Sequence, residues 1–201
     1  MTETFIVVAG EEKKEFTVHK NIAIGSSKFF RAALSREWKE AQEKRVPLQE
    51  VEPTIFECYL QWLYTGHVTF ETPAWVARVR SYILADFLGD PNFSNAVVDS
   101  MIAKAVETKG FYGAESIEVI WRDTPADSPL RAITLEMCSV LSLSHLAKSF
   151  KNNPQYSRDF IVDYLAHVGS SHLGQKSVLN IYKLKEACLR HKQQIPDEES
   201  T

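Results

Sequence analysis

Side chains that could bind a metal ion are few in this chain, and only one small group lies close together in the sequence. The group consists of Asp163, His167 and His172. A helix is predicted to carry the first two residues, and the stretch Gly169-Ser170-Ser171 places His172 beyond the end of that helix. We therefore interpret these three residues as ordinary polar residues at the surface and predict no metal site. The sequence contains no His-Glu-x-x-His segment, no cysteine pair at zinc-binding spacing and no glycine-rich phosphate loop with its lysine.

Nucleophilic catalysis finds equally little support. Serine, histidine and aspartate all occur, but no Gly-x-Ser-x-Gly segment presents a nucleophile on a sharp turn. An enzyme would need several reactive side chains in one deep pocket with strongly shifted pKa values, namely Cys138, His145, Asp163 and His167. We predict a non-enzymatic protein without a catalytic residue or a cofactor, and an enzyme is the alternative.

The composition indicates a compact protein that does not bind nucleic acid directly. The 201 residues are 44% hydrophobic, which is enough to bury a substantial core. The formal net charge of -3 provides no basic face for nucleic acid. The sequence shows neither a secretion signal nor an apolar run near the roughly 20 residues that span a bilayer. Because its three cysteines are odd in number and widely separated, we expect a reducing compartment, the cytoplasm or the nucleus.

A β-hairpin is predicted at the start of the chain. Residues 5–9 are apolar throughout, residues 16–19 alternate between apolar and polar, and the polar stretch between them begins with Gly10. Residues 45–48 are too few for a helix. Because proline lacks the N–H that a central strand needs, Pro47 restricts this segment to an edge strand.

Helices are predicted from the spacing of apolar residues and from the residue types that begin or end helices. Gly25 is predicted to break the first helical stretch, and Ser26 or Ser27 to cap the next one. Pro53 fits the first turn of an amphipathic helix that Gly66 ends. The predicted helical segments are residues 22–34 with their break, 53–65, 73–88 with Thr72 as its cap, 91–108, 116–122, 130–150 as the longest, 160–168 and 177–191, with a further short strand at 67–70.

An ordered set of short segments resembles a known domain. The segments are Val7-Val8-Ala9-Gly10, Phe16-Thr17-Val18-His19-Lys20, Ser26 to Leu34, Val46-Pro47-Leu48, Phe56 and Leu63-Tyr64-Thr65-Gly66. In this order and at these intervals they resemble the BTB/POZ domain. The resemblance implies an α+β fold over residues 3–108, a small mixed sheet flanked by helices. The helical pattern that follows predicts an extension over 111–192, and the polar, acidic composition of 193–201 predicts a disordered tail. Ile120-Trp121 and Ser128-Pro129-Leu130-Arg131 resemble the region that follows the domain in many fungal BTB proteins.

The resemblance implies a dimerisation surface at the start of the domain. Related dimeric domains place a basic residue, here Lys20, in a charged pocket beside an acidic residue that precedes the first core strand, here Glu3. A solvated Glu3 is the alternative. Phe29 and Phe30 would extend the surface, and His19 is expected to be structural. Because only four residues precede the hairpin, we expect a homodimer without exchange of an N-terminal strand, a monomer, or assembly through the C-terminal helices.

The resemblance also implies a second surface, for a cullin. BTB adaptors of cullin-RING ubiquitin ligases carry a hydrophobic-x-Glu motif before the third strand, and Trp38-Lys39-Glu40 occupies that place. A tryptophan in such a polar segment needs either its own domain or a partner to cover it, so packing of Trp38 on its own domain is the alternative. Tyr64 is assigned to the same cullin-type surface.

Together, these features predict a protein-interaction module that is a substrate adaptor for a cullin-containing ubiquitin ligase. The alternative is a BTB scaffold or a transcription-linked dimerisation protein that is not associated with a ligase. Partners are expected to be proteins, and neither nucleic acid nor a membrane is expected to be bound directly.

Overall fold

The computed structural model describes residues 3–35, 43–70, 75–108, 110, 112–139, 148, 150–152 and 156–170. The chain forms two compact units. The first unit falls within Met1–Pro73 and Arg80–Val97, and the second within Ala74–Val79 and Val98–Thr201. The cuts after Val79 and after Val97 lie within helices, whereas the sequence places a domain boundary near Lys109 and Gly110. The predicted domain limits stay a prediction.

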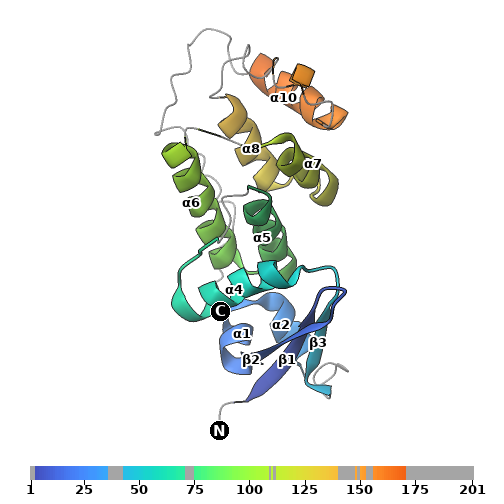
Figure 1. The fold of residues 1–201 in the computed structure, drawn as a ribbon, viewed down its shortest axis with the longest axis vertical. Helices are drawn as coiled ribbons and strands as arrows, with labels where there is room; N and C mark the ends of the chain where they lie inside the picture. The colour runs from blue at the N-terminus through green and yellow to red at the C-terminus, as the bar shows by residue number, and fades with distance from the viewer. Residues whose placement is uncertain are drawn as a thin grey trace. The chain divides into compact units, whose positions relative to one another are not determined.

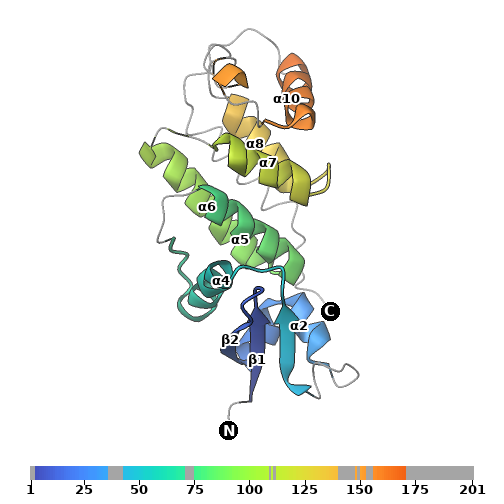
Figure 2. The same ribbon diagram turned by 45° about the vertical axis from the view of Figure 1, so that its right-hand side comes forward.

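The first unit contains a mixed sheet, which in the described part of the chain has three strands in the order β2-β1-β3. β1 (Thr4–Ala9) and β2 (Lys14–His19) form the predicted antiparallel hairpin, and β3 (Arg45–Leu48) lies parallel to β1 on the other side (Figure 1). Pro47 lies in β3, so the prediction of an edge strand is confirmed. Figure 2 shows β1 and β3 side by side.

The predicted strand at residues 67–70 is wrong, because these residues form no strand. Side-chain contacts tie this segment to the preceding helix, α4 (Pro53–Thr65), instead of to the sheet. The Thr69 hydroxyl bonds to the Gln61 side chain, and the Cys58 thiol donates to the Thr69 carbonyl at 3.5 Å.

Two short helices follow the hairpin, α1 (Lys20–Ser26) and α2 (Lys28–Ala33). The break between them is at Ser27, whose hydroxyl accepts the backbone N–H of Phe30 at 3.1 Å and so caps α2. The predicted cap is therefore confirmed, but the predicted break at Gly25 is wrong. Gly25 lies inside α1, where nothing surrounds its Cβ position within 4 Å. In α4, Pro53 is the first residue and Gly66 ends the helix with φ 72°, as predicted.

Aromatic side chains link the sheet to the helices of the first unit. Phe5 of β1 packs on Phe30 of α2 with ring centroids 5.4 Å apart, and Phe30 in turn contacts Tyr59 of α4 at 6.5 Å. Tyr59 meets Phe93 edge-on at 5.0 Å. All four rings are buried. Burial of a large apolar side chain contributes about 1.5–3 kcal/mol, so this series of rings stabilises much of the unit.

A buried carboxylate joins three helices of the same unit. Asp90 lies between α5 (Trp75–Leu88) and α6 (Pro91–Thr108), and it is 1% exposed. Its Oδ1 accepts the backbone N–H of Phe93 at 3.0 Å, which caps the first turn of α6. Its Oδ2 accepts the hydroxyls of Ser26 at 2.5 Å and Tyr59 at 3.1 Å. Asp90 therefore fixes the start of α6 against α1 and α4.

The second unit contains α7 (Ala114–Asp123), α8 (Pro129–Ser139) and α10 (Arg158–Ser170). The predicted loop between α7 and α8 is confirmed. α10 continues through Gly169 and Ser170, so the predicted helix end before Gly169 is wrong. Of the predicted helix over 130–150, the structure describes α8 up to Ser139 and residues 148 and 150, both helical. The longest described helix is α6 with 18 residues. The predicted helix over 177–191 and the tail over 193–201 lie outside the described residues.

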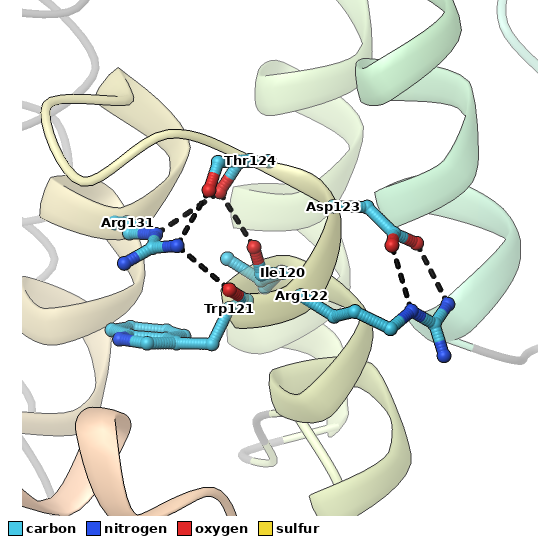
Figure 3. Close-up of polar contacts among 6 residues, drawn as sticks. All are labelled: Ile120, Trp121, Arg122, Asp123, Thr124 and Arg131. Atoms are coloured by element: carbon cyan, nitrogen blue, oxygen red, sulfur yellow. Dashed lines mark hydrogen bonds and ion pairs between the residues drawn. The ribbon is translucent and has the colours of Figure 1, made fainter.

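Arg131 of α8 closes the C-terminal end of α7 (Figure 3). Its guanidinium donates to the carbonyl oxygens of Trp121 at 2.7 Å and Thr124 at 2.5 Å, and to the Thr124 hydroxyl at 3.1 Å. The same cation lies 5.3 Å from the centroid of the Trp121 ring, and the Trp121 Nε1–H donates to Asp163 of α10 at 2.8 Å. Trp121 and Arg131, which the sequence resemblance singled out, thus connect the three helices of this unit.

Among the helices that the structure describes, none combines the length and the apolar character needed to cross a bilayer.

Candidate functional site

A cluster of charged and aromatic side chains surrounds the point where β2 passes into α1. We call it the junction cluster, and it consists of Glu3, His19, Lys20, Lys44 and Tyr64. His19 is the last residue of β2 and precedes α1 with φ -72° and ψ 120°, while Lys20 begins the helix. Side chains from three other places in the chain lie around this point. Glu3 comes directly before β1, Lys44 directly before β3, and Tyr64 is in the last turn of α4.

Glu3 is paired with two lysines in this cluster. Its carboxylate lies 3.2 Å from Lys20 Nζ and 3.6 Å from Lys44 Nζ, and its carbonyl oxygen accepts the backbone N–H of Lys20 at 2.9 Å. The hydrogen bond and the charge of Lys20, with a smaller effect from Lys44, hold the pKa of Glu3 below its usual range. The two side chains predicted for a charged pocket are therefore in contact, and their part in dimerisation stays a prediction.

Tyr64 lies in the last turn of α4 and is 45% exposed, yet its hydroxyl is held at two points. The backbone N–H of His19 donates to the hydroxyl at 3.0 Å, and the hydroxyl lies 2.9 Å from His19 Nδ1. The rings of His19 and Tyr64 meet edge to face with centroids 5.7 Å apart. An exposed aromatic ring is thus anchored at its polar end, which suits a protein-binding surface.

Phe29 and Phe30 are consecutive in α2 but point into different surroundings. Phe30 is 0% exposed, so its side chain belongs to the core. It therefore offers no area to a partner, although the sequence predicts it as part of the dimerisation surface. Phe29 is half-buried and packs on Phe87 of α5 with ring centroids 4.8 Å apart. Phe87 is 55% exposed, so Phe29 and Phe87 together form a surface aromatic pair.

Trp38 and Glu40, predicted for the cullin-type surface, lie outside the described residues, between α2 and β3. Sequence reasoning missed Lys44 and Phe87 as site residues. The signal for Lys44 was its place directly before the predicted edge strand at residues 45–48. In the structure Ile6 donates its N–H to the Lys44 carbonyl at 2.8 Å, and Glu3 lies near the same end of β1. For Phe87, the signal was a large apolar residue close to the predicted end of its helix.

The residues considered for an enzyme or a metal site have other surroundings. Cys138 is 1% exposed, and burial raises the pKa of its thiol to about 12, which disfavours the reactive thiolate. Asp163 accepts the hydrogen bond from Trp121. His145 and His172 lie outside the described residues. Within the described ranges, no three histidine, cysteine or acidic side chains gather as metal ligands would.

A sequence model of the BTB/POZ domain matches residues 2–104, slightly more than half of the chain. Kelch-like protein 38 of Danio rerio is 33% identical over 63 residues, which is 31% of this chain and 11% of that protein. Kelch-like protein 24 of Homo sapiens is 34% identical over 71 residues, 35% of this chain and 11% of that protein. BTB/POZ domain-containing protein 9 of Homo sapiens is 34% identical over 86 residues, 42% of this chain and 12% of that protein. These similarities therefore concern a small part of each relative.

Proposed function

The chain belongs to the BTB/POZ domain family, and we propose that it is a protein-interaction module that binds a cullin scaffold as a ubiquitin-ligase adaptor. The structural observation that carries this proposal is the anchored, exposed ring of Tyr64. Tyrosine and tryptophan dominate protein interfaces because a ring adds a large apolar area at a low cost in side-chain entropy.

Trp38 and Glu40 supply the other contacts of the proposed cullin surface. Trp38-Lys39-Glu40 matches the hydrophobic-x-Glu motif of cullin adaptors in residue type and in its place before β3. Trp38 would fill an apolar pocket of the partner, and Glu40 would pair with a donor at the rim of that pocket. Burial of such a tryptophan commonly contributes about 2 kcal/mol or more to binding when it is tested by truncation.

Binding alone performs this function. The chain would join a client to the ligase by contacting both, and its own residues would neither transfer a group nor move a proton. The α7–α8–α10 unit would recruit another partner or support the cullin surface. Such an adaptor would act in the cytoplasm or nucleus, without a cofactor or metal ion.

Calorimetry with the N-terminal domains of the cullins from the chain's own organism tests the proposal. We expect micromolar or tighter binding to one of them, weakened about 30-fold or more by Trp38→Ala and substantially by Glu40→Ala and Tyr64→Ala. Glu12→Ala, an exposed residue in the hairpin turn, is the matched control and should bind as the wild type does. Absence of binding by a folded wild-type protein at high micromolar concentration would overturn the proposal.

A second candidate function is self-association as a scaffold or a transcription-linked dimer. The surface pair of Phe29 and Phe87 favours it, because a large exposed apolar side chain is typical of an interface core. Light scattering should then give the molar mass of a dimer for the wild type and of a monomer for Phe87→Asp. A wild-type monomer at high micromolar concentration would contradict this candidate.

A further inference from the structure

The backbone N–H groups of His19 and Lys20, at the end of β2, point in opposite directions. β2 is an edge strand in the described sheet, with β1 on one side only. The N–H of Lys20 points to β1, where it donates to the Glu3 carbonyl at 2.9 Å. Because successive N–H groups of a strand point to opposite sides, the N–H of His19 faces the open edge, and there it meets the Tyr64 hydroxyl at 3.0 Å.

Two contacts of the Tyr64 hydroxyl come from one residue. The hydroxyl accepts the backbone N–H of His19 at 3.0 Å. The ring nitrogen Nδ1 of His19 lies 2.9 Å from the same hydroxyl oxygen, within hydrogen-bonding distance. The backbone and the ring of His19 therefore hold the same tyrosine oxygen.

The His19 side chain takes no part in capping its own helix. His19 precedes α1 at the position where a side chain often bonds to the first turn, but it makes no such bond. Its side chain turns to Tyr64 instead, a residue 45 positions later. The contact is therefore specific to the pairing of the β2 end with the α4 end.

From these contacts we propose that His19 is a positioning residue for Tyr64. One residue binds the tyrosine hydroxyl through both its backbone and its ring, and it thereby holds an exposed aromatic side chain in one orientation. A side chain held in its binding orientation loses less entropy when a partner covers it. This inference rests on the proposed function, since the partner considered is the cullin N-terminal domain.

A double-mutant cycle in the full chain tests the coupling. His19→Ala removes the contact between the imidazole and the hydroxyl, and Tyr64→Phe removes that contact together with the bond from the His19 backbone N–H. Both variants keep an aromatic ring at position 64. We expect each to weaken cullin binding about 3- to 10-fold, the scale of immobilising one side chain, with Tyr64→Phe at least as weak as His19→Ala. The double variant should be no weaker than Tyr64→Phe alone. His19→Asn should restore binding, because its amide oxygen can accept from the Tyr64 hydroxyl.

The outcomes separate the inference from the proposed function. If Tyr64→Ala weakens binding and His19→Ala does not, or if the effects of His19→Ala and Tyr64→Phe simply add, the positioning role is overturned and the cullin surface stands. If the wild type binds no cullin, the proposed function fails, and the free protein decides the inference. For that purpose the imidazole nitrogens are observed by NMR: an Nδ1 signal that Tyr64→Phe shifts supports the inference, and an Nδ1 signal that Tyr64→Phe leaves unchanged overturns it.

Discussion

Glu3 and Asp90 are carboxylates in opposite surroundings, and their pKa values move in opposite directions. Lys20 lowers the pKa of exposed Glu3, whereas burial raises the pKa of Asp90 against the lowering effect of its hydrogen bonds. Stabilisation from Glu3 is therefore present above its unfolded-state pKa and lost as the pH falls through the lower folded-state value. Stabilisation linked to protonated Asp90 is instead lost as the pH rises from the unfolded-state to the folded-state pKa.

Replacement of Glu3 by glutamine should flatten the acid limb of the stability profile. In the wild type, protonation of Glu3 at low pH removes its attraction to Lys20. Glutamine carries no charge at any pH, so the variant has no such attraction to lose. Urea unfolding between pH 2 and pH 7 should give a smaller loss of stability for Glu3→Gln than for the wild type. Glu11→Gln, in the exposed hairpin turn, is the control. An unchanged acid limb in Glu3→Gln would show that the pair contributes nothing.

At the scale of elements, two glycines of the first unit should respond oppositely to alanine. Gly25 lies within α1 with open space around it, so Gly25→Ala should stabilise the protein by about 0.5 kcal/mol through helix propensity. Gly66 ends α4 at φ 72°, a conformation that costs an L-residue about 1–2 kcal/mol, so Gly66→Ala should destabilise it. Both variants are compared by urea unfolding. Destabilisation by Gly25→Ala as large as that by Gly66→Ala would contradict a helical Gly25.

The start of α6 should depend strongly on Asp90. Asp90→Ala removes the cap of α6 and leaves the Phe93 N–H and the Tyr59 hydroxyl without this acceptor in a buried site. We expect a loss of about 2–4 kcal/mol in the free energy of unfolding. Asn92→Ala, which changes an exposed neighbour, should stay within about 0.5 kcal/mol of the wild type. Equal stability of the two variants would be incompatible with this role of Asp90.

Local signals predicted most elements, and non-local pairing explains the errors. The hairpin, the serine cap of α2 and the Pro53-to-Gly66 helix follow from residues that act on their immediate neighbours. The strand at 67–70 was predicted from its residues, but a strand also needs a partner strand, and this segment bonds to α4. The sequence predicts a helix break at Gly25, but glycine is tolerated inside a short helix, at a cost, where other contacts hold it.

The family resemblance predicts the part of the candidate site that depends on positions shared within the family. It predicts the pair of Glu3 and Lys20, whose side chains are in contact in the structure. It could not reveal the bond between His19 and Tyr64, because that bond joins residues far apart in sequence and depends on side-chain orientation. Nor could it separate Phe29 from buried Phe30, since adjacent residues of one short helix differ in exposure only once the neighbouring elements are placed.

The residues of the proposed cullin surface all fall within the BTB/POZ part of the chain. Residues 2–104 match the BTB/POZ domain, and they include Trp38, Glu40 and Tyr64. Trp121, Arg131 and Asp163 hold the second unit together through their own contacts. We therefore expect substitutions within that set to lower the stability of the second unit.

Hydrogen exchange of the wild-type chain, measured with and without a saturating cullin N-terminal domain, tests whether Trp38, Glu40 and Tyr64 form a cullin-binding surface. It reports where a partner covers the protein and requires no variant. We predict slower exchange in peptides that span residues 36–42 and 60–66, with peptides over the end of α5 near Phe87 unchanged. Unchanged exchange throughout the chain, or protection confined to α2 and the end of α5, would contradict the claim that Trp38, Glu40 and Tyr64 form a cullin-binding surface.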